Sequence, residues 1–506
     1  MSDSTNQPPE LGAGASAVGA SDASAPVSPA GLAARIPVAD ELAGPDESPA
    51  LGEGRLDSLP SGAIRRQVFV LALPMLGEQF GNFLVGFVDV LLAGRVSMEA
   101  TAAVGTGGYM GWFVTLAFTM LSIGTAALVS RSFGAKDLHT ANRALNQSLL
   151  MALALGALVS AVVFVTAPSL ATLLAQTDSA RVLFTTYVRI DSLGYALFAI
   201  VLVCGGALRA AGDTRTPMMI MVAVNVINII VSAGLVYGWM GLPKLGVTGI
   251  AIGTVTARSL GGVLMAGVLM RGLRGLQLRR DRWRPDFGII RRIFKVGLPA
   301  AGDAVLTFIT HMGFLLVVTH TAVGDAATVN YAAHTIGIRM EAISFLPAVA
   351  WMTASATLVG QYLGANRPEL AARAGHTAAG QAALLTGAIG VAFYVFAEQI
   401  YSFMSSDPEV VAVGAHAFRI MAFVQPMLGM AIVYIGSLRG AGDTRATMIF
   451  SLIGGVCLRV PVAWLFGVYL GGGLLGAWIG MWCDNLAKFI LGGGRFLHGG
   501  WKRIRV

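Results

Sequence analysis

An apolar segment at residues 68–93 contains three polar side chains, Glu78, Asn82 and Asp89, that fall on one face of a helix. A helix turns about 100° per residue, so Asn82 and Asp89 lie about 40° and about 20° from Glu78 around the axis. A carboxyl group that faces lipid is very unfavourable, so this face is expected to line a water-filled cavity and to exchange protons or bind cations there. The alternative for Glu78 and Asn82 is a hydrogen bond to a neighbouring helix.

The chain repeats its own sequence pattern. Residues 206–215, GALRAAGDTR, recur as GSLRGAGDTR at 436–445, and LVSRSFGA at 128–135 recurs as LVGQYLGA at 358–365. Both pairs of motifs are 230 residues apart. Duplicated halves around a site near the middle of the membrane are a common architecture of secondary transporters. The duplication therefore favours a transporter.

The repeat distinguishes Glu78 from Asp89, the two acids of the first segment. Glu78 and Asp303 each follow a proline by four residues, so an acid is present at this position in both halves. These two acids either support the architecture or belong to the site. Asp89 aligns with Phe314, so its carboxylate is present in one half only. A binding site needs no symmetry, and Asp89 is therefore the leading candidate for ion coupling.

Further polar residues extend the candidate site. In segment 217–238, the amides of Asn225 and Asn228 and the hydroxyl of Ser232 either coordinate a cation or bond neighbouring helices. His311 is a candidate proton carrier, although a single histidine inside the membrane is more often a hydrogen-bonded core residue. The remaining cavity candidates are polar or charged side chains within apolar segments: Asp191, Asp303, Thr307, Thr310, Arg339 and Glu341.

The composition indicates a membrane protein. Hydrophobic residues make up 55% of the 506 residues and charged residues only 12%, whereas soluble domains carry about 25% charged residues. The predicted fold class is an all-α membrane protein with twelve transmembrane helices in two pseudo-symmetric six-helix lobes. The expected spans are 68–93, 102–129, 145–168, 184–207, 217–238, 247–270, 296–319, 328–358, 376–400, 413–436, 447–469 and 473–494.

The domain boundaries follow from these spans. We expect a disordered cytoplasmic tail at 1–64, lobes at 65–270 and 296–496, a basic cytoplasmic linker at 271–295 and a basic cytoplasmic tail at 497–506. Lysine and arginine are concentrated on one side, which places both termini of this multi-pass protein in the cytoplasm and the chain in the inner membrane. The other basic loops expected on that side are 131–143, 209–215, 367–373 and 439–445.

Several function classes are excluded. The sequence contains no GxxxxGK[ST], HExxH or GxSxG motif, and no cluster of cysteine and histidine. We therefore expect no enzymatic activity, no cofactor and no metal site. Nucleic acid is excluded as a partner because no soluble domain is present to carry a basic face.

Several long motifs resemble the multidrug and toxic compound extrusion (MATE) family. They include the repeated LRxAGDTR motif, LPMLGEQFGNFLVGFVDVLLAGR in the first predicted span and GAWIGMWCDN in the last. The similarity covers about residues 65–496. It implies a V-shaped bundle of two six-helix lobes and ion-coupled export of organic molecules by alternating access.

The resemblance assigns a role to Asp89, which corresponds to a helix-1 aspartate that is linked to protons or sodium ions in characterised branches. NorM-like members also use a helix-7 glutamate and a helix-10 aspartate, but segments 305–314 and 425–431 contain no acid. DinF-like members pair the aspartate with an Asn-x-x-x-Asp motif, and here those positions hold Asn228 and Ser232. One matching carboxylate remains, which favours protons over sodium ions as the coupling ion.

The sequence therefore predicts an antiporter, driven by protons or sodium ions, that exports amphipathic, cationic organic compounds across the inner membrane. The protein is expected to act as a monomer in the lipid bilayer. The alternative is a lipid-intermediate flippase of the same superfamily, which would need a strongly cationic cavity for phosphate groups. A non-transporting membrane scaffold is a further alternative, but it has no use for a buried acidic stripe.

Overall fold

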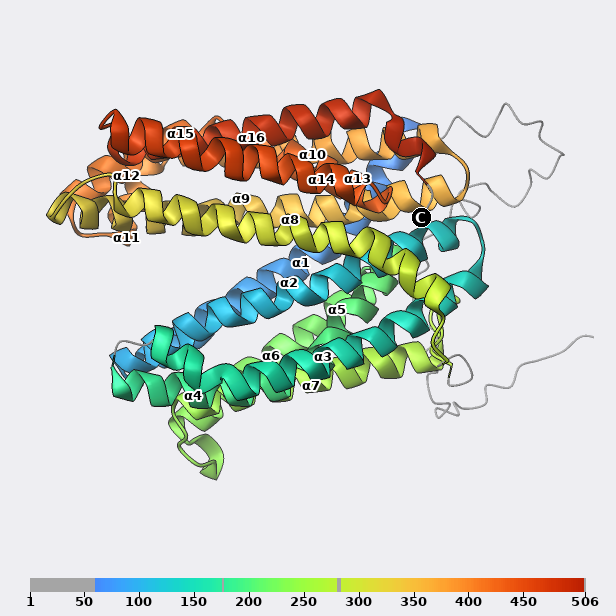
Figure 1. The fold of residues 1–506 in the computed structure, drawn as a ribbon, viewed down its shortest axis with the longest axis horizontal. Helices are drawn as coiled ribbons and strands as arrows, with labels where there is room; N and C mark the ends of the chain where they lie inside the picture. The colour runs from blue at the N-terminus through green and yellow to red at the C-terminus, as the bar shows by residue number, and fades with distance from the viewer. Residues whose placement is uncertain (1–59, 175–176, 280–283, 505–506) are drawn as a thin grey trace, which may run out of the picture. The chain divides into compact units, whose positions relative to one another are not determined.

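The computed structural model describes residues 60–174, 177–279 and 284–504. Apart from residues 60–64, the expected tail 1–64 lies outside the described residues. All regular secondary structure in the described ranges is helical (Figure 1). Every described residue belongs to one unit, residues 57–506.

The first half of the chain forms its six expected spans from seven helices. α4 and α5 together make the expected span 184–207, which is bent by 51°. The helices are α1 (Ser61–Gly94), α2 (Met98–Gly134), α3 (Leu138–Leu174), α4 (Asp178–Leu193), α5 (Tyr195–Ala210), α6 (Arg215–Tyr237) and α7 (Val247–Arg271).

The second half repeats this order. α12 and α13 form the expected span 413–436, bent by 55°, and one span runs through α14 and α15 with π-helical turns at Leu452–Arg459 and Leu465–Tyr469. The helices are α8 (Phe287–Thr319), α9 (Asp325–Gly364), α10 (Pro368–Val395), α11 (Ala397–Met404), α12 (Pro408–Ala422), α13 (Gln425–Gly440), α14 (Thr444–Ser451), α15 (Val460–Trp464) and α16 (Gly473–His498).

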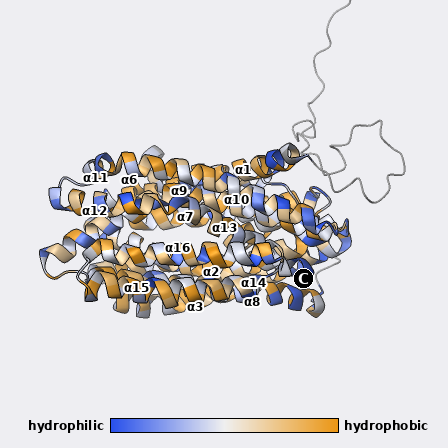
Figure 2. Cartoon of the chain, turned by 90° about the horizontal axis from the view of Figure 1, so that it is seen from above, coloured by the Kyte–Doolittle hydropathy of each residue, from blue (hydrophilic) through white to orange (hydrophobic). Residues whose placement is uncertain are grey.

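These helices confirm the predicted all-α membrane fold. Among the described residues, nine helices are long and apolar enough to cross a bilayer, or up to eleven spans when each bent pair counts as one. α16 is the twelfth expected segment; it is less apolar because Asp484, Asn485 and Lys488 lie in its middle. Apolar residues predominate along the helices, whereas hydrophilic residues are concentrated towards their ends (Figure 2).

The two bends lie at equivalent positions in the repeat. α4 ends before Gly194 and α13 begins after Val424, and these two residues are 230 positions apart. Gly194 donates its backbone N–H to the carbonyl of Asp191, which closes the last turn of α4. In the second half, Pro426 occupies the first turn of α13, where its missing N–H costs nothing. The first bend matters for the site because it sets the position of Asp191.

Two predicted boundaries differ from the structure. The expected linker 271–295 is shorter, because Asp286 accepts hydrogen bonds from the backbone N–H groups of Gly288 and Ile289 and starts α8 at Phe287. The expected basic tail 497–506 is folded over residues 497–503. There, the fully buried ring of Trp501 stacks on Phe496 at 4.6 Å between centroids.

Each half places the start of its first helix in the core of the other half. Ile64, Val68 and Leu71 of α1 pack in a cluster whose residues outside α1 all belong to the second half of the chain. Ile289 and Ile293 of α8 pack in the cluster formed by the first half. The two halves therefore share their cores at this end. The expected lobe boundaries at 65–270 and 296–496 do not describe this exchange.

The same end contains a close crossing of α2 and α9, which we call the α2–α9 crossing. A Cβ on Gly134 would overlap the backbone oxygen of Gln361, and a Cβ on Gly364 would overlap that of Arg131. Arg131 donates to the carbonyl of Ala441 at 3.1 Å, and Gln361 donates to that of Ala210 at 2.8 Å. Arg131 and Gln361 are equivalent in the repeat, so the crossing is symmetric.

Two equivalent ion pairs lie beside this crossing. Arg209 donates to both oxygens of Glu78 at 3.1 Å, and Arg439 donates to Asp303 at 2.6 Å. Both arginines were expected in loops 209–215 and 439–445, but each lies in the last turn of a helix. Because the acid recurs after 225 residues and the arginine after 230, the geometry is that of a shared architectural element.

The α2–α9 crossing generates a first prediction. Gly134→Ala should force the two backbones apart and lower the free energy of unfolding by about 1–3 kcal/mol, the usual cost of overpacking. The measurement is thermal unfolding of the purified protein. Gly380→Ala is the matched control, because a Cβ there meets nothing within 4 Å. Equal melting temperatures for the two variants would contradict the packing argument.

The paired acids generate a second prediction. Glu78→Gln and Asp303→Asn should each lower stability, by about 1–3 kcal/mol, because each leaves a largely buried guanidinium without its charge partner. Asp178→Asn serves as the control, since its pair with Arg181 is exposed and contributes little. Unfolding curves and protein yield report the effect. A normal unfolding curve for Glu78→Gln together with lost transport would instead place Glu78 in the site.

Candidate functional site

A cavity of about 740 Å³ lies between helices of both halves. Most of its lining comes from α1, α2 and α4–α7, and α9 and α13 supply the remainder. Six of the predicted site residues lie on its wall: Glu78, Asn82, Asp89, Asp191, Asn225 and Asn228. The polar stripe of the first span therefore faces a cavity, as its spacing predicts.

Asp89 differs from the other charged groups that line the cavity. Its Oδ1 atom is buried and has no hydrogen-bond partner. The other charged lining residues are all paired: Glu78 with Arg209, Asp191 with Arg258, and Arg439 with Asp303. Among the described lining residues, Asp89 is thus the charged group for which no ion pair is found. A carboxylate in this setting can take up a proton or bind a cation.

Amide side chains form one wall near Asp89. Asn225 donates to the side-chain oxygen of Asn82 at 3.2 Å, and Asn228 donates to Thr254 at 3.2 Å. The side-chain oxygen of Asn228 is buried without a partner, as is the hydroxyl of Ser232. Ser232 is fully buried against α7 and is not among the residues that line the cavity.

A buried ion pair connects α4 to α7 on the same wall. Arg258 Nη1 donates to Asp191 Oδ1 at 2.7 Å, and the Asp191 side chain is 5% exposed. The guanidinium lies over the ring of Phe198 at 4.6 Å from its centroid. Arg258 is therefore held by a carboxylate and an aromatic face.

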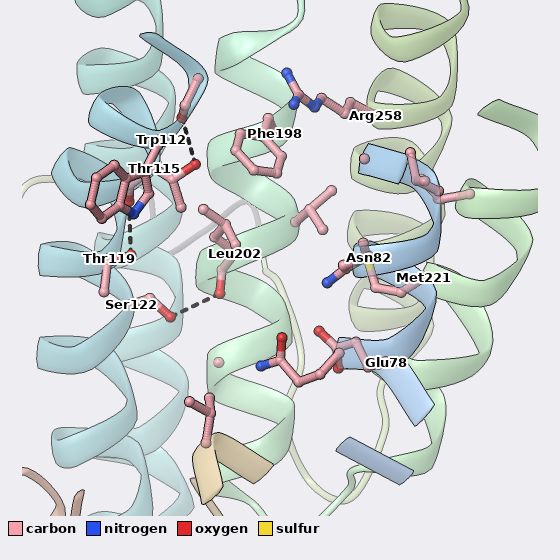
Figure 3. A pocket seen from close by; sticks show the side chains of 18 of the residues that line it. Glu78, Asn82, Trp112, Thr115, Thr119, Ser122, Phe198, Leu202, Met221 and Arg258 are labelled. Atoms are coloured by element: carbon pink, nitrogen blue, oxygen red, sulfur yellow. Dashed lines mark hydrogen bonds between the residues drawn. The ribbon is translucent and has the colours of Figure 1, made fainter. Parts of the chain in front are cut away.

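The opposite wall is aromatic and weakly polar. Figure 3 shows Trp112 and a row of hydroxyl side chains on one side, with Asn82, Met221 and Glu78 on the other. The hydroxyls of Thr115 and Thr119 donate to carbonyls of their own helix at 2.8 Å. Because these donors are already used, this wall offers mainly apolar contact to a ligand.

The second half contributes none of its predicted site residues to the cavity lining. Asp303 reaches the cavity only through Arg439. Thr307 and Thr310 donate to the backbone of α8, and the Nδ1 atom of His311 lies 2.8 Å from the carbonyl of Thr307. Arg339 is exposed. None of the six predicted residues of this half is among the cavity-lining residues: Asp303, Thr307, Thr310, His311, Arg339 and Glu341. The structure therefore does not bring these six to the wall of this cavity.

Glu341 belongs to a separate ionic cluster inside the second half. Asp484 pairs with Lys488 at 2.9 Å and lies 3.7 Å from Arg459. Arg459 lies over the ring of Phe314 at 4.4 Å from its centroid, and Glu341 is an electrostatic neighbour of Arg459 and Asp484. Phe314 is the repeat equivalent of Asp89, so a stacked arginine fills the region that corresponds to the coupling candidate.

Arg258 and the cavity role of Arg209 are not among the residues predicted from the sequence. Arg258 lies in the middle of the expected span 247–270, and an ionisable residue inside a span is by itself a functional signal. Its partner on another helix could not be identified from spacing. Trp112, Tyr187 and Phe198 gave no comparable signal, because aromatic residues occur throughout apolar helices.

Comparison with protein families identifies the duplicated pattern. The model of the MatE family matches residues 74–233 and 299–465, which together make up more than half of the chain. The two matched segments fall in the two halves defined by the repeat.

Curated relatives match along nearly their whole length. The "Probable multidrug resistance protein NorM" of Thermotoga maritima is 29% identical over 449 residues, which cover 88% of this chain and 94% of the relative. The "Multidrug resistance protein PmpM" of Pseudomonas aeruginosa is 29% identical over 427 residues, with coverage of 83% and 87%.

Solved structures share the fold. A structure described as MATE in complex with MaL6 has a TM-score of 0.79 at 22% identity and covers 86% of this chain and 95% of that chain. A MOP superfamily transporter from Pyrococcus furiosus, with the same coverage, has a TM-score of 0.77 at 22% identity. With the family match across both of its halves, this chain belongs to the MatE family of multidrug and toxic compound extrusion transporters.

Proposed function

We propose that this chain exports amphipathic organic cations in exchange for protons. The observation that carries the proposal is Asp89, a carboxylate without an ion pair on the wall of a cavity of about 740 Å³. A cation with aromatic or aliphatic groups would find one negative charge and a wall that includes Trp112, Phe198 and Met221. Multidrug resistance relatives in Thermotoga maritima and Pseudomonas aeruginosa support this class of substrate.

Competition at Asp89 provides the coupling. The ionised carboxylate binds the organic cation, and the protonated carboxyl group does not. A proton taken up from outside displaces the substrate, and loss of that proton to the cytoplasm restores the binding site. Proton and substrate are then linked reciprocally, because each lowers the affinity for the other.

Alternating access requires the cavity to open to both sides of the membrane. The halves touch through the α2–α9 crossing, where Gly134 and Gly364 bring the backbones together. In our proposal this crossing separates when the cavity opens to the cytoplasm. The orientation rests on the positive-inside rule, which predicts that both termini are cytoplasmic. In our proposal the protein acts as a monomer in the inner membrane.

Sodium is the second candidate for the coupling ion. Three buried side-chain oxygens on α1 and α6 lack hydrogen-bond partners, namely Asp89 Oδ1, Asn228 Oδ1 and Ser232 Oγ. Oxygen atoms of this kind are ligands for hard cations. Protons remain the first choice, because a single carboxylate is neutralised by a proton without several ligands around it.

The flippase alternative receives less support. The structure of the Pyrococcus furiosus transporter is described as showing that "reverse polarity of binding pocket suggests different function". In this chain, Arg209, Arg258 and Arg439 also line the cavity, which sequence analysis did not foresee. Each of these arginines is neutralised by an acid, so the cavity offers no free cationic group among its described lining residues for a lipid phosphate.

The coupling role of Asp89 generates a third prediction. Asp89→Asn should reduce ethidium efflux from proteoliposomes under a pH gradient to the level of liposomes without protein, because the amide cannot change charge. Its melting temperature should stay near that of the unaltered protein. Asp325→Asn, the same change at an exposed position, is the control. Efflux that survives Asp89→Asn and still follows the pH gradient would refute the assignment.

The choice of ion generates a fourth prediction. Proteoliposomes with a pH gradient and no sodium should accumulate ethidium, whereas a sodium gradient at equal pH should not drive accumulation. The physical reason is that one carboxylate with amide neighbours binds a proton more readily than it builds a sodium site. Accumulation under the sodium gradient alone would contradict protons as the coupling ion.

A further inference from the structure

We propose that the ion pair between Asp191 and Arg258 sets the pH range in which Asp89 exchanges its proton. Both residues are positioning residues, since they act through Asp89. This inference rests on the proposed function and deepens it by adding its regulation. It gives a role to an ion pair that takes no direct part in the proposed exchange of proton and substrate at Asp89.

The pair is held rigidly beside the cavity. Arg258 on α7 donates to Asp191 on α4 at 2.7 Å, with exposed side-chain fractions of 26% and 5%. Phe198 on α5 supports the guanidinium from one face. Asp191 lies at the bend between α4 and α5, where its carbonyl accepts the N–H of Gly194. Three helices thus fix one positive and one negative charge on the cavity wall.

Asp89 lies within the field of both charges. Asp89, Tyr187, Asp191 and Arg258 all line the same cavity, and Arg258 and Asp191 are the charged groups that act on Asp89. The guanidinium favours the anionic form of Asp89, and the carboxylate of Asp191 opposes it. Loss of the Arg258 guanidinium should therefore raise the proton affinity of Asp89, and loss of the Asp191 carboxylate should lower it.

Other charged groups on the surrounding helices do not take this role. Glu78 and Arg209 neutralise each other, and Arg439 is paired with Asp303. Asn82, Asn225 and Asn228 are uncharged. The remaining acids, basic residues and histidines on helices packed against α1 lie at helix ends, in the first turns of α10 or in the second half: Glu99 and Arg131 on α2, Arg215 on α6, Arg271 on α7, Asp325, His334, Arg339 and Glu341 on α9, and Glu369, Arg373 and His376 on α10.

The repeat supports a functional origin for this group of charges. Asp89 and Asp191 align with Phe314 and Met421 in the second half. The motif GIAIG at 249–253 aligns with GAWIG at 476–480, and this places Arg258 opposite Asn485. All three charges are thus specific to the half that supplies most of the cavity, whereas the architectural pair of Glu78 and Arg209 occurs in both.

The test is the pH dependence of ethidium binding to the purified full chain, followed by fluorescence. In the unaltered protein, binding should fall as Asp89 takes up its proton at low pH. Arg258→Gln should move the midpoint up by about one pH unit, and Asp191→Asn should move it down by about as much. The double variant should lie between the two single variants and above the original midpoint, because Arg258 acts on Asp89 more strongly than Asp191 does.

Two control variants accompany this test. Arg189→Gln removes a guanidinium from α4 outside the cavity lining and should leave the midpoint unchanged. Arg258→Lys keeps the charge and should also keep the midpoint, which covers the case that Arg258→Gln does not fold. Shifts of Arg258→Gln and Asp191→Asn in the same direction, or no shift in Asp191→Asn, would overturn the inference.

The proposed function fails in a different way. It fails if the unaltered protein does not bind ethidium, if its binding does not depend on pH, or if Asp89→Asn keeps the same pH profile. The inference alone fails when the unaltered protein binds ethidium in a pH-dependent way and Asp89→Asn changes that pH profile, but Arg258→Gln and Asp191→Asn do not shift the midpoint in opposite directions.

Discussion

Direct contact between two helix backbones is the constraint on which the rest of this structure depends. At the α2–α9 crossing, Gly134 and Gly364 allow each helix to touch the carbonyl of the other. α1 and α8 begin in the core of the opposite half, which closes the same end with apolar side chains. The cavity itself is lined mostly by helices of the first half, and α9 and α13 of the second half supply the remainder.

The two halves keep a common frame and differ in their buried charges. The frame includes the ion pairs of Glu78 with Arg209 and of Asp303 with Arg439. In the first half, Asp89 and the pair of Asp191 and Arg258 face the cavity. In the second half, the charges of Arg459, Asp484 and Lys488 pair inside the bundle, and Arg459 stacks on Phe314. One duplicated framework therefore supports one asymmetric site.

The cavity combines a single charge with adaptable walls. Its arginines are neutralised, so the ligand-facing electrostatics reduce largely to Asp89. Methionine side chains on α1, α6, α7 and α9 line it beside aromatic rings, and thioethers adapt to ligands of different shape. In the function proposed here, such walls would accept ligands of different outline as long as they carry a positive charge and apolar groups.

The sequence alone determined the twelve spans, the duplication and the stripe of Glu78, Asn82 and Asp89, because these depend on local composition and on the fixed turn of a helix. Helical periodicity says which residues share a face, but it does not say what that face meets. Only the tertiary structure showed that Arg258 pairs with Asp191 and that Arg209, expected in a loop, pairs with Glu78. It also showed that Thr310 and His311 do not line the cavity. These partners lie far apart in the chain, and helix packing alone brings them together or separates them.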